Sequence, residues 1–318
     1  MLKTILSLNP IVFHSLIVIA SLIVLAKSAH YIVLGISNYA RKIGVSDYLI
    51  GLLVISVGTA VPELVASITG ASIGQGGIVF GTILGSSLFK IPLLGLVLII
   101  ARKVTIDREV KTNPPILSFV GTMLPFALIL DGVLSRADGI LLLMVFLWYC
   151  YRLWTAEKKF GKLKSNVPFR IIWKDALIFL IALAALLLSA RWLVFSSMVM
   201  SDYFGISPFL VGLIVIGIGA SAPELLVQIT SIRKKHNDIA FGNAVGSLVA
   251  NSAFALGIAP LVKPIAIEPL SLLSTGIFFL LGTVAVIYLM ERKEVNWRHG
   301  IALILLYITF LGIELAVG

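Results

Sequence analysis

Residues 51–69 of this chain read GLLVISVGTAVPELVASIT, and residues 212–230 read GLIVIGIGASAPELLVQIT. The second stretch is a close copy of the first, 161 residues further along, and it places Glu224 at the position equivalent to Glu63. The same offset relates other positions without a gap: Pro62 to Pro223, Gly85-Ser86 to Gly246-Ser247, and Asp138-Gly139-Ile140 to His299-Gly300-Ile301. The chain is therefore predicted to be a duplicated unit, each copy carrying a glutamate, a proline and glycines in an apolar segment.

The composition around these motifs is that of a membrane protein. Hydrophobic residues make up 59% of the 318 residues and charged residues 13%, and the mean hydropathy is +1.08. Apolar runs long enough to cross about 30 Å of hydrocarbon recur along the whole chain. Ten are predicted: 11–37, 48–71, 78–101, 114–131, 138–154, 174–200, 208–231, 239–262, 270–290 and 299–317. The predicted fold class is an all-α polytopic membrane protein with ten transmembrane helices.

The distribution of Lys and Arg predicts the orientation of these helices. The formal net charge is +10, and positive residues concentrate on the cytoplasmic side of membrane proteins. One set of alternate connections holds nineteen Lys and Arg, in 41–42, 102–111, 152–174, 233–235 and 292–298, against Lys3, Arg136 and Lys263 on the other side. Both termini are therefore predicted to lie outside, in the cell membrane. The expected partners are inorganic cations and the lipid bilayer. Nucleic-acid binding is not expected, because no run remains for a soluble basic domain.

The duplication also predicts the domain organisation. The first membrane repeat covers 1–155 with its motif at 51–90, and the second covers 174–318 with its motif at 212–251. The segment 156–173 is the predicted cytoplasmic linker. Five spans in each copy force the second copy to enter the membrane the opposite way round. Inverted repeats of this kind are typical of secondary transporters, whose sites lie near the bilayer midplane on interrupted helices.

Prolines interrupt the two motif helices directly before the glutamates. A proline within a helix removes one backbone hydrogen bond and clashes with the carbonyl four residues earlier. In lipid, a freed carbonyl must be satisfied by protein, water or an ion. Pro62 and Pro223 are expected to loosen carbonyls near Ser56 and Gly217. Both breaks are therefore candidate ligand positions.

The buried glutamates indicate a cation site. A carboxylate in the middle of a membrane costs about 2.5 kcal/mol or more, so it is normally paired, protonated or bound to a cation. Hard cations such as Ca²⁺ and Na⁺ take oxygen ligands, and Ca²⁺ takes about six to eight of them. The predicted ligands are the carboxylates of Glu63 and Glu224, the hydroxyls of Thr59, Ser86, Ser221 and Ser247, the amide oxygen of Asn251, and the carbonyls of Ser56 and Gly217.

A purely structural role is the alternative to a cation site. A protonated glutamate can hold two helices together, and serines in helices often bond back to the backbone. Two glutamates in matching contexts favour a site over this alternative. No resident cofactor is expected, since Ca²⁺ and Na⁺ (or H⁺) would be transported ions.

The paired motifs resemble the two α-repeats of the sodium/calcium exchanger family, within the calcium:cation antiporter superfamily. The resemblance lies in VGTAVPE at 57–63 with GTILGS at 81–86, and in IGASAPE at 218–224 with GNAVGS at 242–247. It implies a ten-helix exchanger whose first and sixth spans slide past a core of the other eight. It also places the family's glutamates on Glu63 and Glu224, its hydroxyl ligands on Thr59, Ser86, Ser221 and Ser247, and its helix-break carbonyls on Ser56 and Gly217.

The chain departs from the family pattern at Lys90. The family usually has an asparagine at this position, four residues after the serine of the Gly-Ser pair, and the equivalent position in the second copy holds Asn251. One hypothesis is that the Lys90 ammonium takes the place of a transported Na⁺ or acts as a proton-linked switch. The alternative is that the side chain extends towards the membrane interface.

The predicted function is secondary active antiport of Ca²⁺ against Na⁺ by alternating access, without enzymatic chemistry. The nearest alternative is a Na⁺-independent or proton-coupled cation exchanger in which Lys90 replaces a bound Na⁺. A passive channel is disfavoured because paired broken helices fit a closed central site better than a continuous pore. An intramembrane enzyme is also disfavoured, because the apolar runs contain no metal-binding His pair, nucleophile–base set or nucleotide loop.

Overall fold

The computed structural model describes residues 10–42, 56–105, 115–157, 172–221, 224–225, 228–229, 232, 237–267, 272–292 and 294–317. Most of these residues are helical, and helical residues occur in each predicted apolar run. Within the described ranges, six helices are long and apolar enough to cross a membrane: Ile11–Ser28, Gly76–Ala101, Leu180–Phe204, Gly242–Val262, Leu273–Glu291 and Trp297–Glu314. The predicted helical membrane class is therefore confirmed.

The first half of the chain contains long helices and one broken helix. Its helices are α2 (Pro10–Lys42), α4 (Ser56–Thr59), α5 (Val61–Ser72), α6 (Gly76–Ala101), α7 (Pro115–Leu128) with the 3₁₀ turn η3 (Ile129–Asp131), and α8 (Arg136–Glu157). The predicted run 48–71 is not one continuous helix, because α4 ends and α5 begins on either side of Ala60.

The second half contains two π-helical segments that the sequence did not predict. Its helices are α9 (Ile172–Phe204), α10 (Pro208–Leu210), the π-helix η5 (Val211–Ile216), α11 (Gly217–Ala220), α13 (Asn237–Val249), the π-helix η6 (Ala250–Ala255), α14 (Leu256–Val262), α15 (Leu273–Glu291) and α16 (Trp297–Val317). Such π-helical turns are rare, and they are frequently found at functional sites. Both of them border residues of the predicted cation site.

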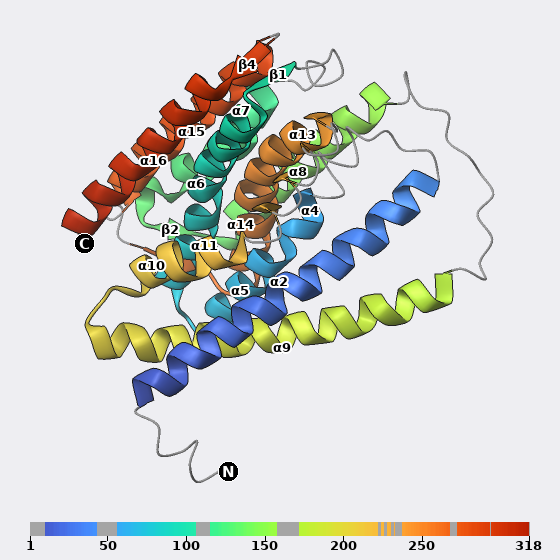
Figure 1. The fold of residues 1–318 in the computed structure, drawn as a ribbon. Helices are drawn as coiled ribbons and strands as arrows, with labels where there is room; N and C mark the ends of the chain where they lie inside the picture. Colours follow the sequence, from blue (N-terminus) through green and yellow to red (C-terminus); the bar gives the residue numbers. More distant parts are fainter. Residues whose placement is uncertain are drawn as a thin grey trace.

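Helix α6 is packed in the middle of the bundle, against η5 on one side and α16 on the other (Figure 1). A Cβ atom on Gly85 would collide with the backbone carbonyl of Leu213, so the backbones of α6 and η5 are in direct contact. Gly95 and Gly300 allow the same close approach between α6 and α16. Small residues at such crossings let helices approach closely within a membrane.

Helices α2 and α9 lie side by side along one edge of the molecule (Figure 1). Their facing residues, including Leu25, Leu186 and Val194, form an apolar cluster with Ile216 of η5. Ile78 of α6 and Val65 of α5 also belong to this cluster, whereas most of α6 belongs to the larger apolar core. The two long helices therefore form a layer of their own against the bundle.

Two short β-ribbons connect the two copies of the unit. Strand β1 (Lys103–Thr105) pairs antiparallel with β4 (Glu294–Asn296), and β2 (Val133–Leu134) pairs antiparallel with β3 (Ile265–Ala266). Val104 lies opposite Val295 in the first ribbon, and Leu134 lies opposite Ile265 in the second. The offset that relates Glu63 to Glu224 also relates Val104 of β1 to Ile265 of β3, and Leu134 of β2 to Val295 of β4. The two ribbons are therefore equivalent contacts made once by each copy.

Candidate cation site

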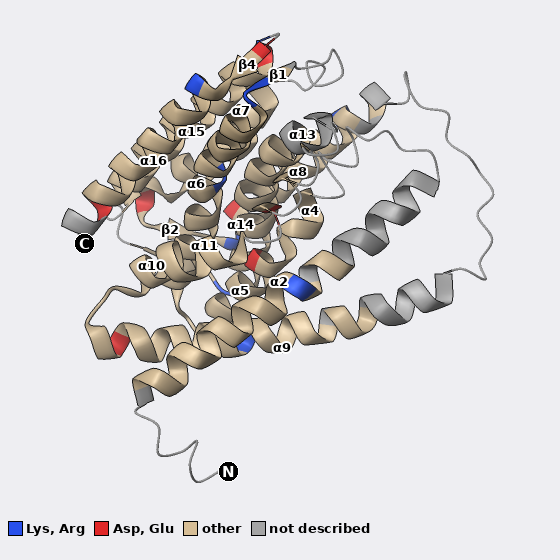
Figure 2. Cartoon of the chain, in the orientation of Figure 1, with Lys and Arg blue, Asp and Glu red and all other residues tan. Residues whose placement is uncertain are grey.

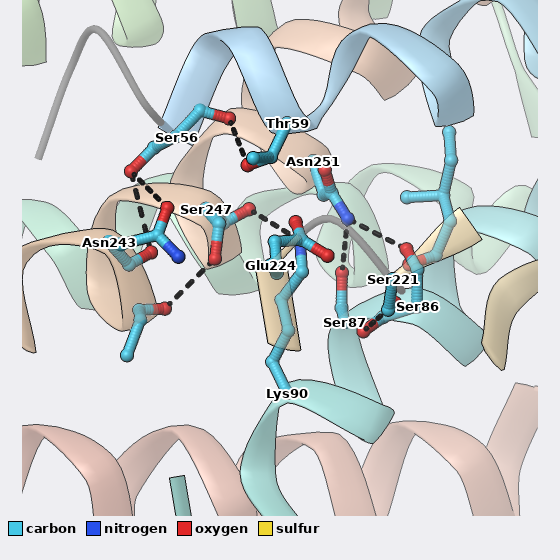
Figure 3. Close-up of polar contacts among 12 residues, drawn as sticks. Ser56, Thr59, Ser86, Ser87, Lys90, Ser221, Glu224, Asn243, Ser247 and Asn251 are labelled. Atoms are coloured by element: carbon cyan, nitrogen blue, oxygen red, sulfur yellow. Dashed lines mark hydrogen bonds and ion pairs between the residues drawn. The ribbon is translucent and has the colours of Figure 1, made fainter. Parts of the chain in front are cut away.

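The predicted site residues converge in the interior of the bundle, where α4, α5 and α6 of the first copy meet α11, α13 and η6 of the second (Figure 3). Charged residues occupy few positions along the described helices, and some of these positions lie in the interior of the bundle (Figure 2). All of the predicted residues are buried: Ser56, Thr59, Glu63, Ser86, Lys90, Gly217, Ser221, Glu224, Ser247 and Asn251. The structure therefore brings the whole predicted set into one polar cluster.

The two helix breaks have nearly the same backbone conformation. Ala60, between α4 and α5, has φ −78° and ψ −7°, and the equivalent Ser221, after α11, has φ −78° and ψ 0°. Pro62 occupies the first turn of α5, followed directly by Glu63. A carboxylate in the first helical turn is favoured by the helix dipole. The break therefore delivers Glu63 into the cluster at the start of a new helix.

Lys90 points into the cluster rather than towards the membrane surface. Its Nζ atom lies 2.8 Å from Oε1 of Glu224, and the two side chains are 1% and 0% exposed. The same ammonium donates to the backbone carbonyl of Ser247 at 3.5 Å. The Lys90 side chain thus reaches from α6 to two residues of the second copy (Figure 3).

Glu63 is also fully buried but has no comparable partner. Lys90, Glu224 and Ser86 are its polar neighbours. Neither glutamate accepts a hydrogen bond of normal geometry from a neutral group among the described residues, but Glu224 has the Lys90 ion pair and Glu63 has none within that part of the chain. A buried charge is costly unless it is paired and hydrogen-bonded. Glu63 is therefore the carboxylate with the greater need for a cation.

Asn251 joins the second copy to the first. Its Nδ2 donates to the hydroxyl of Ser86 at 2.8 Å and to that of Ser87 at 3.3 Å. Its Oδ1 is buried and has no partner among the described residues. A buried amide oxygen without a hydrogen-bond partner is a ligand of the kind that hard cations take.

Four hydroxyls of the cluster donate hydrogen bonds to backbone carbonyls. Ser86 donates to Ile83 at 3.1 Å, and Ser247 donates to Ala244 at 3.2 Å. At the two breaks, Thr59 donates to the Ser56 carbonyl at 3.2 Å and Ser221 to the Gly217 carbonyl at 2.9 Å. Bonding of this kind leaves the hydroxyl lone pairs available as acceptors. The backbone carbonyls of Ser56 and Gly217 therefore already accept one hydrogen bond each, from Thr59 and Ser221.

The family model for sodium/calcium exchanger proteins matches the chain twice, over residues 13–155 and 174–316. The chain belongs to the sodium/calcium exchanger family. The resemblance predicted from the paired motifs is thereby confirmed, and the two matched segments are related by the same offset as Glu63 and Glu224.

Full-length relatives and solved structures agree with this family. The chain is 29% identical to the inner membrane protein YrbG of Escherichia coli over 304 residues, covering 91% of this chain and 92% of that protein. It is 26% identical to the sodium/calcium exchanger MaX1 of Methanosarcina acetivorans, covering 95% and 98%. A structure of the sodium-calcium exchanger NCX_Mj soaked with Na⁺ and Sr²⁺ superposes with a TM-score of 0.71 at 22% identity, covering 95% and 98% of the two chains. That likeness shows the fold.

Sequence reasoning missed several buried polar residues of this exchanger. Asn243 accepts hydrogen bonds from the Ser56 hydroxyl. Its backbone carbonyl oxygen and its Oδ1 atom each lie 3.4 Å from Ser56 Oγ. The Ser87 hydroxyl accepts a hydrogen bond from Asn251. Gln228, which is close to Glu224 in the sequence, is fully buried. The sequence could have indicated two of them. The offset relates Gln228 to Ser67 and Asn243 to Thr82, so each of these positions is polar in both copies. Ser87 has no such signal, since its equivalent is Leu248.

The donor set matches the hard cations that the family name implies. Among the described residues, no three His, Cys, Asp or Glu side chains gather as a metal cluster. Two carboxylates with hydroxyl and amide oxygens suit alkali or alkaline-earth ions, whereas transition metals are selected by imidazole or thiolate ligands. Members of this family are transporters rather than enzymes, in keeping with the sequence prediction.

Proposed function

We propose that this chain is a secondary antiporter that exchanges Ca²⁺ for Na⁺ through the cluster around Glu63 and Glu224. One observation carries this proposal: two fully buried carboxylates, delivered by equivalent helix breaks, share a cluster with hydroxyl and amide oxygens. Cation antiport follows from the family. The assignment of Ca²⁺ and Na⁺ draws on MaX1, which is named a sodium/calcium exchanger.

The site would hold Ca²⁺ or Na⁺ as transported substrates in turn. The negative charge of the two glutamates would attract the ion, and hydroxyl and amide oxygens of the cluster would complete its oxygen shell. An exchanger needs both ions to compete for the same charged groups. An occupied site no longer carries the net negative charge of the empty cluster, and this change would allow the site to change its exposure.

A ten-helix architecture with inverted repeats is part of the same proposal. The two segments matched by the family model support the duplication. The equivalent ribbons β1–β4 and β2–β3 support a two-fold relation between the copies. Outward termini and a location in the cell membrane remain predictions from the Lys and Arg distribution.

Alternating access would come from sliding of α2 and α9 along the bundle. The apolar windows of α2 and α9 are 22% and 47% buried, against 78% for α6, although α15 and α16 are also mostly unburied at 39% and 28%. The apolar cluster between α2 and α9 touches the bundle through a few residues of α5, α6, η5 and α11, among them Val65, Ile78 and Ile216. A cleft of about 450 Å³ between α5 and α9, lined by Val65, Ile68 and Val194, also leaves space on one side of the pair. These features favour movement of the α2–α9 layer over movement within the core.

A second candidate is cation exchange that is independent of Na⁺ or coupled to protons. The ion pair between Lys90 and Glu224 favours it, because an ammonium already occupies part of the cluster. The same flux measurement separates the two candidates.

The test is uptake of radioactive Ca²⁺ into proteoliposomes loaded with Na⁺, with and without an outward Na⁺ gradient, and again with a pH gradient alone. Uptake that follows the Na⁺ gradient supports Ca²⁺/Na⁺ exchange. Uptake driven only by the pH gradient supports the second candidate. Glu63→Gln serves as the control for leak, and no uptake above this control under either gradient would overturn both candidates for Ca²⁺.

Cross-linking tests the sliding layer. In a Cys150→Ser background, which removes the single natural cysteine, His14→Cys/Ser196→Cys joins α2 to α9, since His14 Nδ1 lies 3.2 Å from Ser196 Oγ. Ile68→Cys/Val194→Cys joins α5 to α9 across the cleft. A short bifunctional thiol reagent should stop exchange in the second variant and spare most of it in the first. Equal inhibition of both would contradict joint sliding.

A further inference from the structure

We infer that the two halves of the central site are unequal: Lys90 permanently fills the Glu224 half as a tethered cation, and the transported cation binds in the Glu63 half. This inference rests on the proposed function, because it assigns positions within the same site. We define the Glu63 half as Glu63, Ser86 and Asn251. The Glu224 half is defined as Glu224, Ser247 and Lys90.

The two halves are equivalent by the offset of the duplication. The offset that relates Glu63 to Glu224 also relates Ser86 to Ser247 and Lys90 to Asn251. Their cross-contacts are equivalent as well. Asn251 of the second copy donates to Ser86 of the first at 2.8 Å, and Lys90 of the first donates to the backbone of Ser247 in the second at 3.5 Å. Each half is therefore completed by a residue from the opposite copy.

The chemistry of these completing residues differs. Lys90 brings a positive charge to within 2.8 Å of Glu224, so the Glu224 half is already balanced. Asn251 brings a neutral amide whose Oδ1 is buried without a partner among the described residues. Neither Glu63 nor Glu224 accepts a hydrogen bond of normal geometry from a neutral group among the described residues, but of the two only Glu224 lies within ion-pair distance of an ammonium. The Glu63 half thus holds an unbalanced carboxylate and a free oxygen ligand, which are the groups that a cation would satisfy.

The tethered charge also changes which ion the site prefers. With Glu63, Glu224 and Lys90 ionised, the cluster carries one net negative charge. One Na⁺ neutralises it, whereas one Ca²⁺ leaves an excess positive charge close to the Lys90 ammonium. Repulsion between buried like charges is strong. Lys90→Asn is therefore expected to strengthen Ca²⁺ binding by about tenfold or more, and to raise the number of Na⁺ ions bound together.

The decisive experiment compares the equivalent serines in two backgrounds. Purified full-length protein in detergent is titrated with Na⁺ or Ca²⁺ alone, by calorimetry and by the cation-dependent shift in thermal denaturation. With Lys90 present, Ser86→Ala should weaken cation binding about tenfold more than Ser247→Ala, since one hydroxyl belongs to each half. With Lys90→Asn, the two substitutions should weaken binding to a similar extent.

A mirrored variant gives an independent measurement. Lys90→Asn/Asn251→Lys moves the tethered charge to the other half, so Ser247→Ala should become the more damaging substitution. Thermal denaturation without added cation shows whether each variant is folded. Equal sensitivity of the two serines with Lys90 present would overturn the inference even if exchange is observed. Unequal sensitivity in binding, without exchange in liposomes, would uphold the inference and overturn the proposed function.

Discussion

Among the described residues, two lysine–glutamate ion pairs join the first copy to the second, and they differ mainly in burial. Lys90 and Glu224 approach to 2.8 Å with side chains 1% and 0% exposed. Lys103 and Glu294, on the β1–β4 ribbon, approach to 2.9 Å with side chains 63% and 56% exposed. The near-identical distances show that geometry alone does not tell a functional pair from a surface pair. The surroundings of each pair decide its effect.

Water and salt make the ribbon pair weak. Exposed ion pairs typically contribute about 0–1 kcal/mol, because both ions stay well solvated when they separate. In the interior, the loss of one partner leaves the other charge without water or a counter-ion. The Lys90–Glu224 pair is therefore a constraint on the site, and the Lys103–Glu294 pair is expected to be dispensable.

Breaking the buried pair should have the largest effect. Glu224→Gln leaves the Lys90 ammonium buried without its carboxylate, and such losses cost about 3–5 kcal/mol. We expect a lower denaturation midpoint in detergent and loss of cation exchange. Glu224→Asp, which keeps the charge on a shorter side chain, is the control. A Glu224→Gln protein as stable as the wild type would show that Lys90 finds another partner, with Glu63 the nearest candidate.

Disturbing the helix that presents Lys90 should have a smaller effect. A Cβ on Gly85 would meet the backbone of Leu213, which cannot move away as a flexible side chain can. Overpacking of this kind typically costs about 1–3 kcal/mol, so Gly85→Ala should lower the denaturation midpoint and shift Lys90 relative to Glu224. Gly312→Ala on α16 is the matched control, because nothing lies within 4 Å of its added methyl. Similar losses for the two variants would contradict the packing explanation.

Removing both buried charges together should nearly restore stability. Replacing a buried ion pair by apolar side chains of similar volume is often neutral or stabilising, because no charge remains to be desolvated. Lys90→Met/Glu224→Leu is therefore expected to denature within about 1 kcal/mol of the wild type, well above Glu224→Gln. Exchange should still be absent, since one carboxylate of the site is gone. A double variant as unstable as Glu224→Gln would show that the pair is needed for packing itself.

The contrast between the two ion pairs also shows which features of the site can be predicted from the sequence. The offset between Glu63 and Glu224 predicts the equivalent breaks, the shared cluster and the family, since these depend on residue type and spacing. It does not predict which carboxylate Lys90 would reach, because that choice depends on how α6 meets η5 in space. For the same reason Ser87 was missed, as its contact with Asn251 crosses between the copies. The π-helices η5 and η6 were unpredicted because these spans are apolar on most faces, so they show no periodic pattern that a wider helical turn would shift.

Breaking the ribbon pair should have the smallest effect. Glu294→Gln removes the charge that faces Lys103 but keeps the side chain and the backbone pairing of β1 with β4. Because both partners are more than half exposed, the free energy of unfolding should change by less than about 1 kcal/mol. The residual effect should fade as salt is raised, since exposed charges are screened within about 10 Å at 0.1 M ionic strength. The measurement is denaturation in detergent at low and high salt, with cation exchange assayed alongside and expected to match the wild type. A loss as large as that of Glu224→Gln would mean that the ribbon contact holds the two copies in register, and that exposure underestimates its importance.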